Sequence, residues 1–156
     1  MRDLKFVADV HLGKLTKYLR LCGFDTYYHT DLNDQKIISL SLSDKRIILT
    51  RDRGLLKNNK VTHGYWIRSI SPGEQLKDVL FRFDLKRQVA LFKRCMECNG
   101  LLEEVAKEEV IDHLLPKTRQ YFRKFKKCHV CNHIYWNGSH YQRMKKDIKI
   151  LMKNTK

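Results

Sequence analysis

Residues 5–22, KFVADVHLGKLTKYLRLC, join a short β-rich run to an amphipathic helix. The run ends at Asp9. From Leu15 onward, apolar side chains recur at offsets of 3, 4 and 7, as far as Cys22, which is the spacing of one buried helix face. Gly23 ends the helix, because glycine is the usual residue just beyond a helix C-terminus. A strand that feeds a helix in this way is typical of α/β proteins with a parallel sheet.

The alternation of strand and helix continues to about residue 90. Further strands are expected at residues 25–29, 46–50 and 64–68, and further helices from residues 31–34 and from Ser71. Residues 46–50, RIILT, form a continuous apolar run that is typical of a strand buried on both faces. Ser71 suits a helix cap because Pro72 follows at the first helical position. We predict a small α/β sandwich around a mostly parallel sheet.

Two cysteine pairs mark the second half of the chain. Cys95 and Cys98, and then Cys128 and Cys131, have the two-residue spacing that places both thiolates on one ion, and four thiolates complete the tetrahedral shell of structural zinc. The 29 residues between the pairs predict an inserted helix or loop. Disulfides are the alternative, but residues 1–5 show no signal-peptide pattern, so we expect a cytoplasmic protein with free thiols. The fifth cysteine, Cys22, is expected to be a buried thiol.

The charge of the chain indicates a polyanionic partner. There are 32 Lys and Arg against 17 Asp and Glu, a formal net charge of +15, with 42% hydrophobic residues. Such an excess on a folded chain favours nucleic acid. No stretch is apolar enough to span a bilayer and no long basic amphipathic helix with an aromatic face is present, so a membrane partner is not expected. Charge alone leaves RNA and DNA both open.

Aspartates follow the predicted strands. Asp9 follows the first strand, Asp31 and Asp34 the second, and Asp52 the third. Carboxyl ends of parallel strands share one edge of a sheet, where ligand sites form. Clustered carboxylates favour a divalent cation such as Mg²⁺ or Mn²⁺, which can activate water against a phosphodiester. Aspartates are also common helix caps and turn residues, and Asp34 suits a cap for its helix.

Several segments together carry a family resemblance. They are residues 6–9, 12–15, 18–26, 31–38 and 49–53 in the first half, and 94–99, 128–131 and 134–140 in the second. They resemble the PIN-like RNase family named for the Mut-seven C-terminal domain, over almost the whole chain. The resemblance implies a PIN-like nuclease domain at 1–90 with an acidic Mg or Mn site for RNA cleavage at Asp9, Asp34 and Asp52. It also implies a zinc ribbon at 91–156. No clear fourth acid follows Asp52, so Asp31 is kept as an additional candidate.

Basic residues near the acids and in the ribbon are the expected substrate ligands. They are Lys14, Arg20, Arg51 and Arg53 in the first half, and Arg123, Lys124, Lys126 and Lys127 in the second. Residues 119–127 interleave cations with aromatic side chains, which suits phosphate contacts and base stacking, although the same aromatics suit the core of a small ribbon. We therefore expect a metal-dependent endoribonuclease with a basic zinc ribbon. The alternative is a non-catalytic factor that binds RNA, a ribosome or another ribonucleoprotein.

Overall fold

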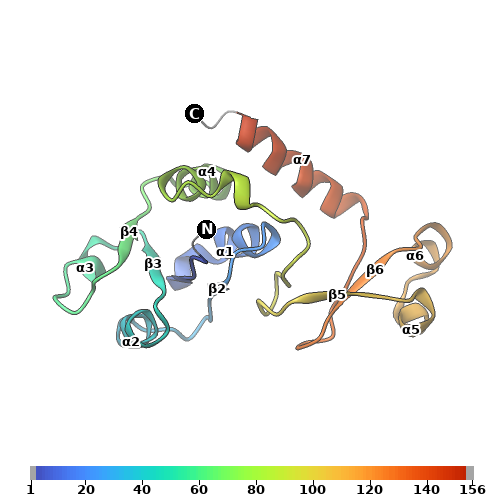
Figure 1. Cartoon of the computed structure of the whole chain (residues 1–156), viewed down its shortest axis with the longest axis horizontal. Helices are drawn as coiled ribbons and strands as arrows, with labels where there is room; N and C mark the ends of the chain where they lie inside the picture. Colours follow the sequence, from blue (N-terminus) through green and yellow to red (C-terminus); the bar gives the residue numbers. More distant parts are fainter. Residues whose placement is uncertain (1–2, 154–156) are drawn as a thin grey trace.

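The computed structural model describes residues 3–153 and contains two sheets. The first is parallel, in the order β2-β1-β3-β4, and the second is antiparallel, in the order β5-β6-β7 (Figure 1). The strands are β1 (Phe6–Ala8), β2 (Thr26–Tyr27), β3 (Ile47–Thr50), β4 (Gly64–Trp66), β5 (Leu102–Val105), β6 (Phe125–Cys128) and β7 (Ile134–Tyr135). The predicted α/β class, with a mostly parallel sheet and a small ribbon, is confirmed.

Helices cover both faces of the parallel sheet, which explains why its strands are continuously apolar. Successive strand side chains point to opposite faces. Phe6 and Ala8 therefore join one buried cluster, and Val7 joins the other. The first cluster contains side chains of α1 (Gly13–Leu21) and α4 (Pro72–Arg82), and the second contains side chains of α2 (Asp34–Asp44) and α3 (Arg53–Leu56). A short 3₁₀ turn, η1 (Val10–Leu12), joins β1 to α1.

Two of the predicted helix starts can be compared with the structure. Ser71 caps α4 as expected, because its side chain accepts a hydrogen bond from the Glu74 backbone N–H and Pro72 is the first helical residue. The expectation that Asp34 caps α2 is wrong. Asn33 is the cap, accepting from the Lys36 N–H at 2.9 Å, and Asp34 is the first helical residue. The Asp34 carboxylate is therefore not used by the cap.

The chain passes from the first sheet to the second along the end of α1. The Ala90 N–H donates to the Cys22 carbonyl at 2.8 Å, and Gly23 adopts φ +94° beside it. A Cβ on residue 23 would lie 2.7 Å from the Ala90 carbonyl oxygen, so both the backbone angle and the close approach require glycine.

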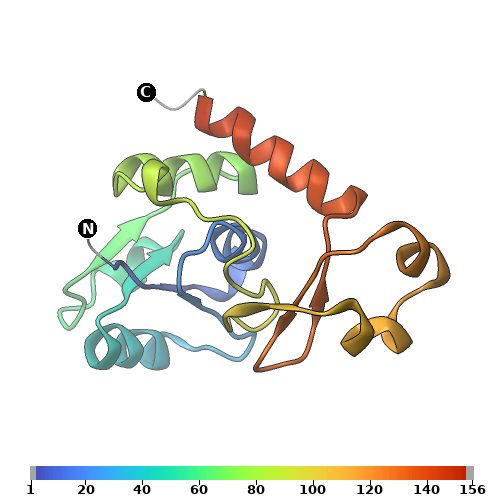
Figure 2. The same ribbon diagram turned by 45° about the vertical axis from the view of Figure 1, so that its right-hand side comes forward.

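The long interval between the cysteine pairs contains helices, as predicted. Between β5 and β6 the chain forms α5 (Lys107–Val110), the 3₁₀ turn η3 (Ile111–His113) and α6 (Pro116–Tyr121). Val110, Leu114 and Phe125 form a separate small buried cluster there. In Figures 1 and 2, α5 and α6 lie at the end of the molecule far from the parallel sheet.

The last helix, α7 (Ser139–Lys153), returns from the ribbon to the first half and packs along α4 (Figures 1 and 2). Its Ile148 is fully buried and belongs to the same cluster as Leu76 and Leu80 of α4. This cluster also contains Cys95 and Tyr135 of the ribbon, so one apolar core extends through both halves. Within residues 3–153, none of the helices has the length and apolarity needed to cross a bilayer.

We expect Ile148→Ala to lower the free energy of unfolding by about 2–5 kcal/mol, because it leaves a cavity where α7 meets the core. Ile150 lies two residues away and is 48% exposed. Ile150→Ala is therefore the matched control, and its effect should stay within about 0.5 kcal/mol. Urea denaturation of both variants measures the difference. Equal losses would show that α7 is not held by its buried face.

Candidate active site and zinc centre

Asp9 and Asp52 meet at the carboxyl ends of two neighbouring strands, β1 and β3. The Thr50 hydroxyl donates to Asp9 Oδ2 at 2.8 Å and accepts from the Asp52 backbone N–H at 2.9 Å. Asp9 Oδ1 also accepts from the His11 N–H at 3.4 Å, and Asp52 Oδ1 accepts from the Gly54 N–H at 2.8 Å. One buried hydroxyl therefore connects the Asp9 carboxylate to the backbone of Asp52, and each carboxylate is oriented by the turn that follows its strand.

The remaining predicted acids follow β2, the other neighbour of β1. Asp34 is exposed on the first turn of α2, and within residues 3–153 its side chain has no hydrogen-bond or ion-pair partner. Asp31 is exposed in the preceding turn, where its backbone N–H donates to His29 Nδ1 and its carboxylate lies 3.7 Å from the same ring nitrogen. Asp31 is thus held beside His29 by its backbone N–H, and the carboxylate of Asp34 is free.

The fit of these acids to a divalent ion depends on the number of protein ligands required. Among residues 3–153, no group of three or more carboxylate or imidazole side chains is gathered closely enough to hold a metal ion. Mg²⁺ is commonly bound by one or two carboxylates, several waters and substrate phosphates. Asp9 and Asp52, which follow adjacent strands, suit that mode of binding, and within the described residues Asp34 does not complete a three-acid cluster with both of them.

A pocket of about 430 Å³ lies beside the acids. Its walls come from the residues that follow Asp9, from Tyr28, and from Ile70, Pro72 and Gln75 around the start of α4. Lys14 is exposed at this pocket, and within the described chain it has no ion-pair partner. The Tyr28 hydroxyl donates to the Val10 carbonyl at 2.7 Å and so braces the turn after Asp9. A phosphate in this pocket would meet the Lys14 ammonium.

An arginine and tryptophan cluster lies on the other side of the acids, and the sequence analysis did not identify it. Trp66 ends β4 directly opposite Thr50, and its indole N–H donates to the Arg51 carbonyl at 3.2 Å. The guanidinium groups of Arg53 and Arg68 lie 4.8 and 5.1 Å from its ring centre. Cation–π contacts of this kind hold the two charges in place. The available sequence signal was a tryptophan near a strand end, two residues before Arg68.

Four cysteines converge in the second half of the chain, as predicted. The sulfurs of Cys95, Cys98, Cys128 and Cys131 all lie within 4.8 Å of one another, and all four thiols are free. The closest approaches are 3.3 Å between Cys98 and Cys128, and 3.6 Å between Cys95 and Cys131. Zn–S bonds of about 2.3 Å in a tetrahedron place sulfurs about 3.8 Å apart. The cluster therefore has the size and donor set of a structural zinc site.

The two cysteine pairs form matching turns. After each pair an asparagine takes a left-handed conformation, Asn99 at φ 74° and Asn132 at φ 66°, and its N–H donates to the first cysteine's carbonyl at 2.9 Å. Asparagine is one of the few non-glycine residues that adopt this conformation readily. A Cβ on Gly100 would lie 2.9 Å from the Cys128 sulfur, so this position requires glycine. The repeated Cys-x-x-Cys-Asn pattern was the sequence signal for both turns.

The surroundings of the sulfurs affect the ionisation of individual cysteines in opposite directions. Burial, with the hydrogen bonds that Cys131 donates to neighbouring sulfurs, raises the pKa of Cys131 to about 12. At Cys128 burial is outweighed by backbone N–H groups of Cys131 and Val130, which lower the pKa to about 7. Tyr135 lies 3.0 Å from the Cys95 sulfur, and burial raises the pKa of its hydroxyl, which remains a donor. Cys22, in contrast, is an isolated thiol whose pKa burial raises to about 12.

A comparison with known families finds a match that spans both halves of the chain. The model of the Mut7-C RNase domain matches residues 4–148, which include the acidic strand ends and all four cysteines. The chain belongs to the Mut7-C RNase domain family. Membership implies ribonuclease activity and an RNA substrate. No curated protein and no solved structure matches the chain significantly.

Arg20 has a structural position in this Mut7-C domain. Its guanidinium is 4% exposed and donates to the carbonyls of Thr26 at 3.0 Å, Met96 at 2.9 Å and Glu97 at 3.2 Å. Burial lowers its pKa, and the nearby thiols of Cys98 and Cys95 act in the opposite direction. The arginine is thus directed at the cysteine cluster and away from the surface, so it does not offer its charge to a substrate phosphate.

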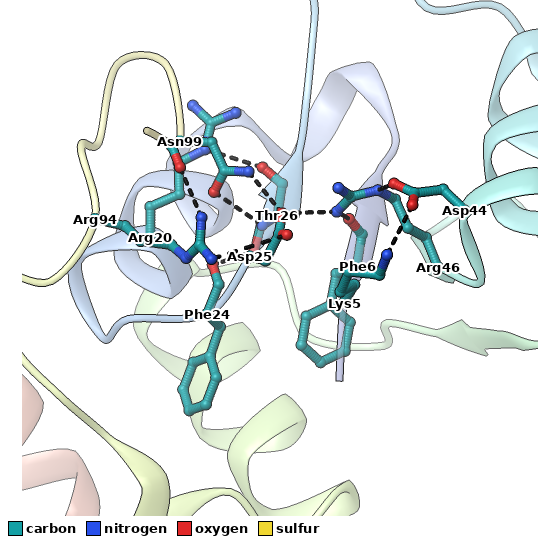
Figure 3. Close-up of polar contacts among 10 residues, drawn as sticks. All are labelled: Lys5, Phe6, Arg20, Phe24, Asp25, Thr26, Asp44, Arg46, Arg94 and Asn99. Carbon is teal, nitrogen blue, oxygen red and sulfur yellow. Dashed lines mark hydrogen bonds and ion pairs between the residues drawn. The ribbon is translucent and has the colours of Figure 1, made fainter. Parts of the chain in front are cut away.

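Asn99 connects the first cysteine turn to the edge of the nuclease sheet (Figure 3). Its amide oxygen accepts from the Thr26 N–H at 3.0 Å, and its amide nitrogen donates to Asp25 Oδ1 at 2.6 Å. Arg46 donates to the same carboxylate oxygen at 2.8 Å. Burial opposes ionisation of Asp25, but the hydrogen bonds from Arg46 and Asn99 hold its pKa below the usual value. The contribution of the ionised carboxylate to stability is therefore complete at neutral pH and is lost only as the pH falls below about 4.

The basic residues predicted in the ribbon divide into engaged and free groups. Lys126 Nζ donates to the Phe92 carbonyl at 2.9 Å, and Lys127 lies opposite Glu103 in the antiparallel sheet. Arg123 and Lys124 are exposed, and within residues 3–153 neither has an ion-pair partner. The Mut7-C domain therefore presents free cations just before β6.

We expect the protein to contain one zinc ion per chain, measured by native mass spectrometry. Cys98→Ser should lose the ion and should unfold at a lower urea concentration, because structural zinc contributes its binding free energy to folding. Cys22→Ala, which removes the isolated thiol, should retain the ion. Full metal content in Cys98→Ser would contradict the four-cysteine assignment.

The matching asparagines allow a controlled test of the Asn99 contact. Asn99→Gly keeps the left-handed backbone available but removes both side-chain hydrogen bonds, and should lower the free energy of unfolding by about 1–3 kcal/mol at pH 7. Asn132→Gly makes the same change in the other turn, where the described side chain makes no hydrogen bond. Urea denaturation with bound zinc measures both. Equal effects would mean that the Asn99 side chain does not stabilise the junction.

Proposed function

We propose that this chain is a metal-dependent endoribonuclease whose active site is the edge of the parallel sheet at Asp9 and Asp52. The observation that carries the proposal is the Thr50 hydroxyl, which donates to the Asp9 carboxylate and accepts from the Asp52 backbone N–H at adjacent strand ends, in a chain of an RNase family. Asp34 is the third acid, exposed on the first turn of α2 and free to approach. The nuclease domain comprises residues 1–90 and the zinc ribbon residues 91–156.

Asp9 and Asp52 would hold a Mg²⁺ or Mn²⁺ ion together with water and a substrate phosphate. Such an ion, when bound, neutralises the phosphate and lowers the pKa of attacking water. The chain's own groups prepare this site, because Thr50 and the backbone N–H groups of His11 and Gly54 fix the carboxylates before substrate arrives. Preorganised carboxylates need no reorientation during the reaction.

The flanking cations supply the contacts to the RNA backbone. Lys14 would hold a phosphate in the pocket beside Asp9, and Arg53 and Arg68, held on the Trp66 ring, would hold phosphates beyond Asp52. Arg51 is exposed next to them. Arg123, Lys124, Lys126 and Lys127 extend the basic surface onto the ribbon, which then contributes to affinity more than to chemistry. Four free cysteines suit a reducing compartment such as the cytoplasm.

Cleavage of end-labelled RNA tests the proposal. Single-stranded and hairpin RNAs, with matched DNAs, are incubated with Mg²⁺, Mn²⁺ or EDTA. We expect RNA products only with metal. Asp9→Asn and Asp52→Asn should each reduce the cleavage rate more than about 100-fold while RNA binding is retained. Mutation of residues that only hydrogen-bond to metal ligands already costs about 10- to 100-fold in metal affinity or activity, and loss of a ligand itself should cost more. Asp34→Asn tests the third acid in the same assay.

Asp112→Asn is the matched control, since Asp112 is an exposed aspartate of η3 in the ribbon and should leave cleavage unchanged. Within the described residues the three acids do not form one metal cluster, and this observation favours a second candidate function. If the wild type binds RNA tightly but does not cleave it with any metal, the proposed nuclease function is wrong. The chain is then a non-catalytic RNA- or ribosome-binding factor.

A further inference from the structure

A second pocket, of about 390 Å³, lies in the ribbon at the end of its sheet away from Cys128. Val105 and Phe125 pair across the strands there, Trp136 follows β7, and Phe92 of the connecting segment closes one side. The volume lies within the range of small-ligand sites. The zinc cluster fixes the other end of the same strands, so the pocket is built on a rigid support.

The wall of this pocket is aromatic and carries unused polar groups. Trp136 is half-buried and packs against Phe125 with 6.3 Å between ring centres. Within residues 3–153, neither the Trp136 indole N–H nor the Asn137 side chain makes a hydrogen bond, and the indole nitrogen is not sealed from solvent. An aromatic face with a neighbouring N–H donor and a carboxamide matches the flat face and polar edge of a nucleobase.

The rim of the pocket has the charge of a phosphate site. Lys107, Arg123, Lys124 and Lys126 line it against a single acid, Glu104. Lys107 and Lys126 already donate to the carbonyls of Arg119 and Phe92. Of these four rim cations, Arg123 and Lys124 therefore have no hydrogen-bond or ion-pair partner for their side chains within residues 3–153. Both come directly before Phe125 in the chain. The aromatic wall complements a nucleobase, and the cationic rim complements the phosphates attached to it.

We propose that this pocket binds one unpaired base of a single-stranded RNA, with Arg123 and Lys124 on the adjoining phosphates. This rests on the RNA-binding part of the proposed function and names the ligand of the ribbon. In a duplex, bases are paired and stacked, so their faces cannot enter the pocket. The ribbon would then select single-stranded segments for the nuclease domain, which the acidic edge alone does not do.

The two tryptophans of the chain provide the test. Trp66→Phe leaves Trp136 as the only tryptophan, and Asp9→Asn is added so that RNA is not cut. The zinc-loaded protein is titrated with a ten-nucleotide RNA, an abasic strand of equal length, a blunt RNA duplex and a mononucleotide. We expect the RNA strand to quench Trp136 emission and to bind at least about fivefold more tightly than the abasic strand, because a stacked base adds that much affinity. The duplex should not quench.

Ala106→Leu fills the pocket without removing an aromatic side chain. It should abolish quenching and reduce the affinity for RNA to that for the abasic strand, while leaving the abasic affinity unchanged. Equal affinity for the RNA and abasic strands, with unchanged Trp136 emission, would contradict base binding in this pocket. It would not contradict the proposed nuclease or its phosphate contacts. If the mononucleotide binds as tightly as the RNA strand, the ligand of the pocket is a free nucleotide and not RNA. Absence of any RNA binding both in this background and by the wild-type protein would overturn both proposals.

Discussion

The arrangement of the whole molecule depends on one contact, in which Asn99 of the first cysteine turn pairs with the outer edge of β2. β2 is an edge strand, so the N–H and C=O of Thr26 that face away from β1 have no strand partner. Asn99 accepts from this N–H, and the buried Arg20 donates to the C=O. The edge that would otherwise be open to another chain is thereby closed. The first cysteine turn is thereby attached directly to the edge of the parallel sheet.

The same junction explains how a chain of net charge +15 separates its cations by role. Arg20 and Arg46 are buried and directed at the cysteine cluster and at Asp25, where unpaired charge would be costly. Lys14, Arg53 and Arg123 remain exposed. Only the second group is available to RNA phosphates, so the number of basic residues overstates the binding surface. Burial decides which cations are structural.

The acidic edge shows how parallel topology creates a site from short-range turns. Each of Asp9 and Asp52 is held by a backbone N–H two residues further on, which is ordinary turn chemistry. They become a pair only because β1 and β3 are neighbours and Thr50 lies between them. A carboxylate that accepts one backbone N–H still has lone pairs for other partners, so the local role of these residues does not use up their capacity.

The sequence by itself determined the strands of the parallel sheet, the main helices, the four-cysteine cluster and the strand-end position of the acids. These follow from local patterns, namely apolar periodicity, cap residues and cysteine spacing, which are legible within a few residues. Only the tertiary structure decided the burial of Arg20, the partner of Asn99, the arginines on Trp66, the pocket beside Trp136 and the separation of Asp34 from the acid pair. Arg20 and Asn99 meet partners 73 to 77 residues away. Contacts over such separations depend on how the two sheets pack against each other, and no local pattern encodes that packing.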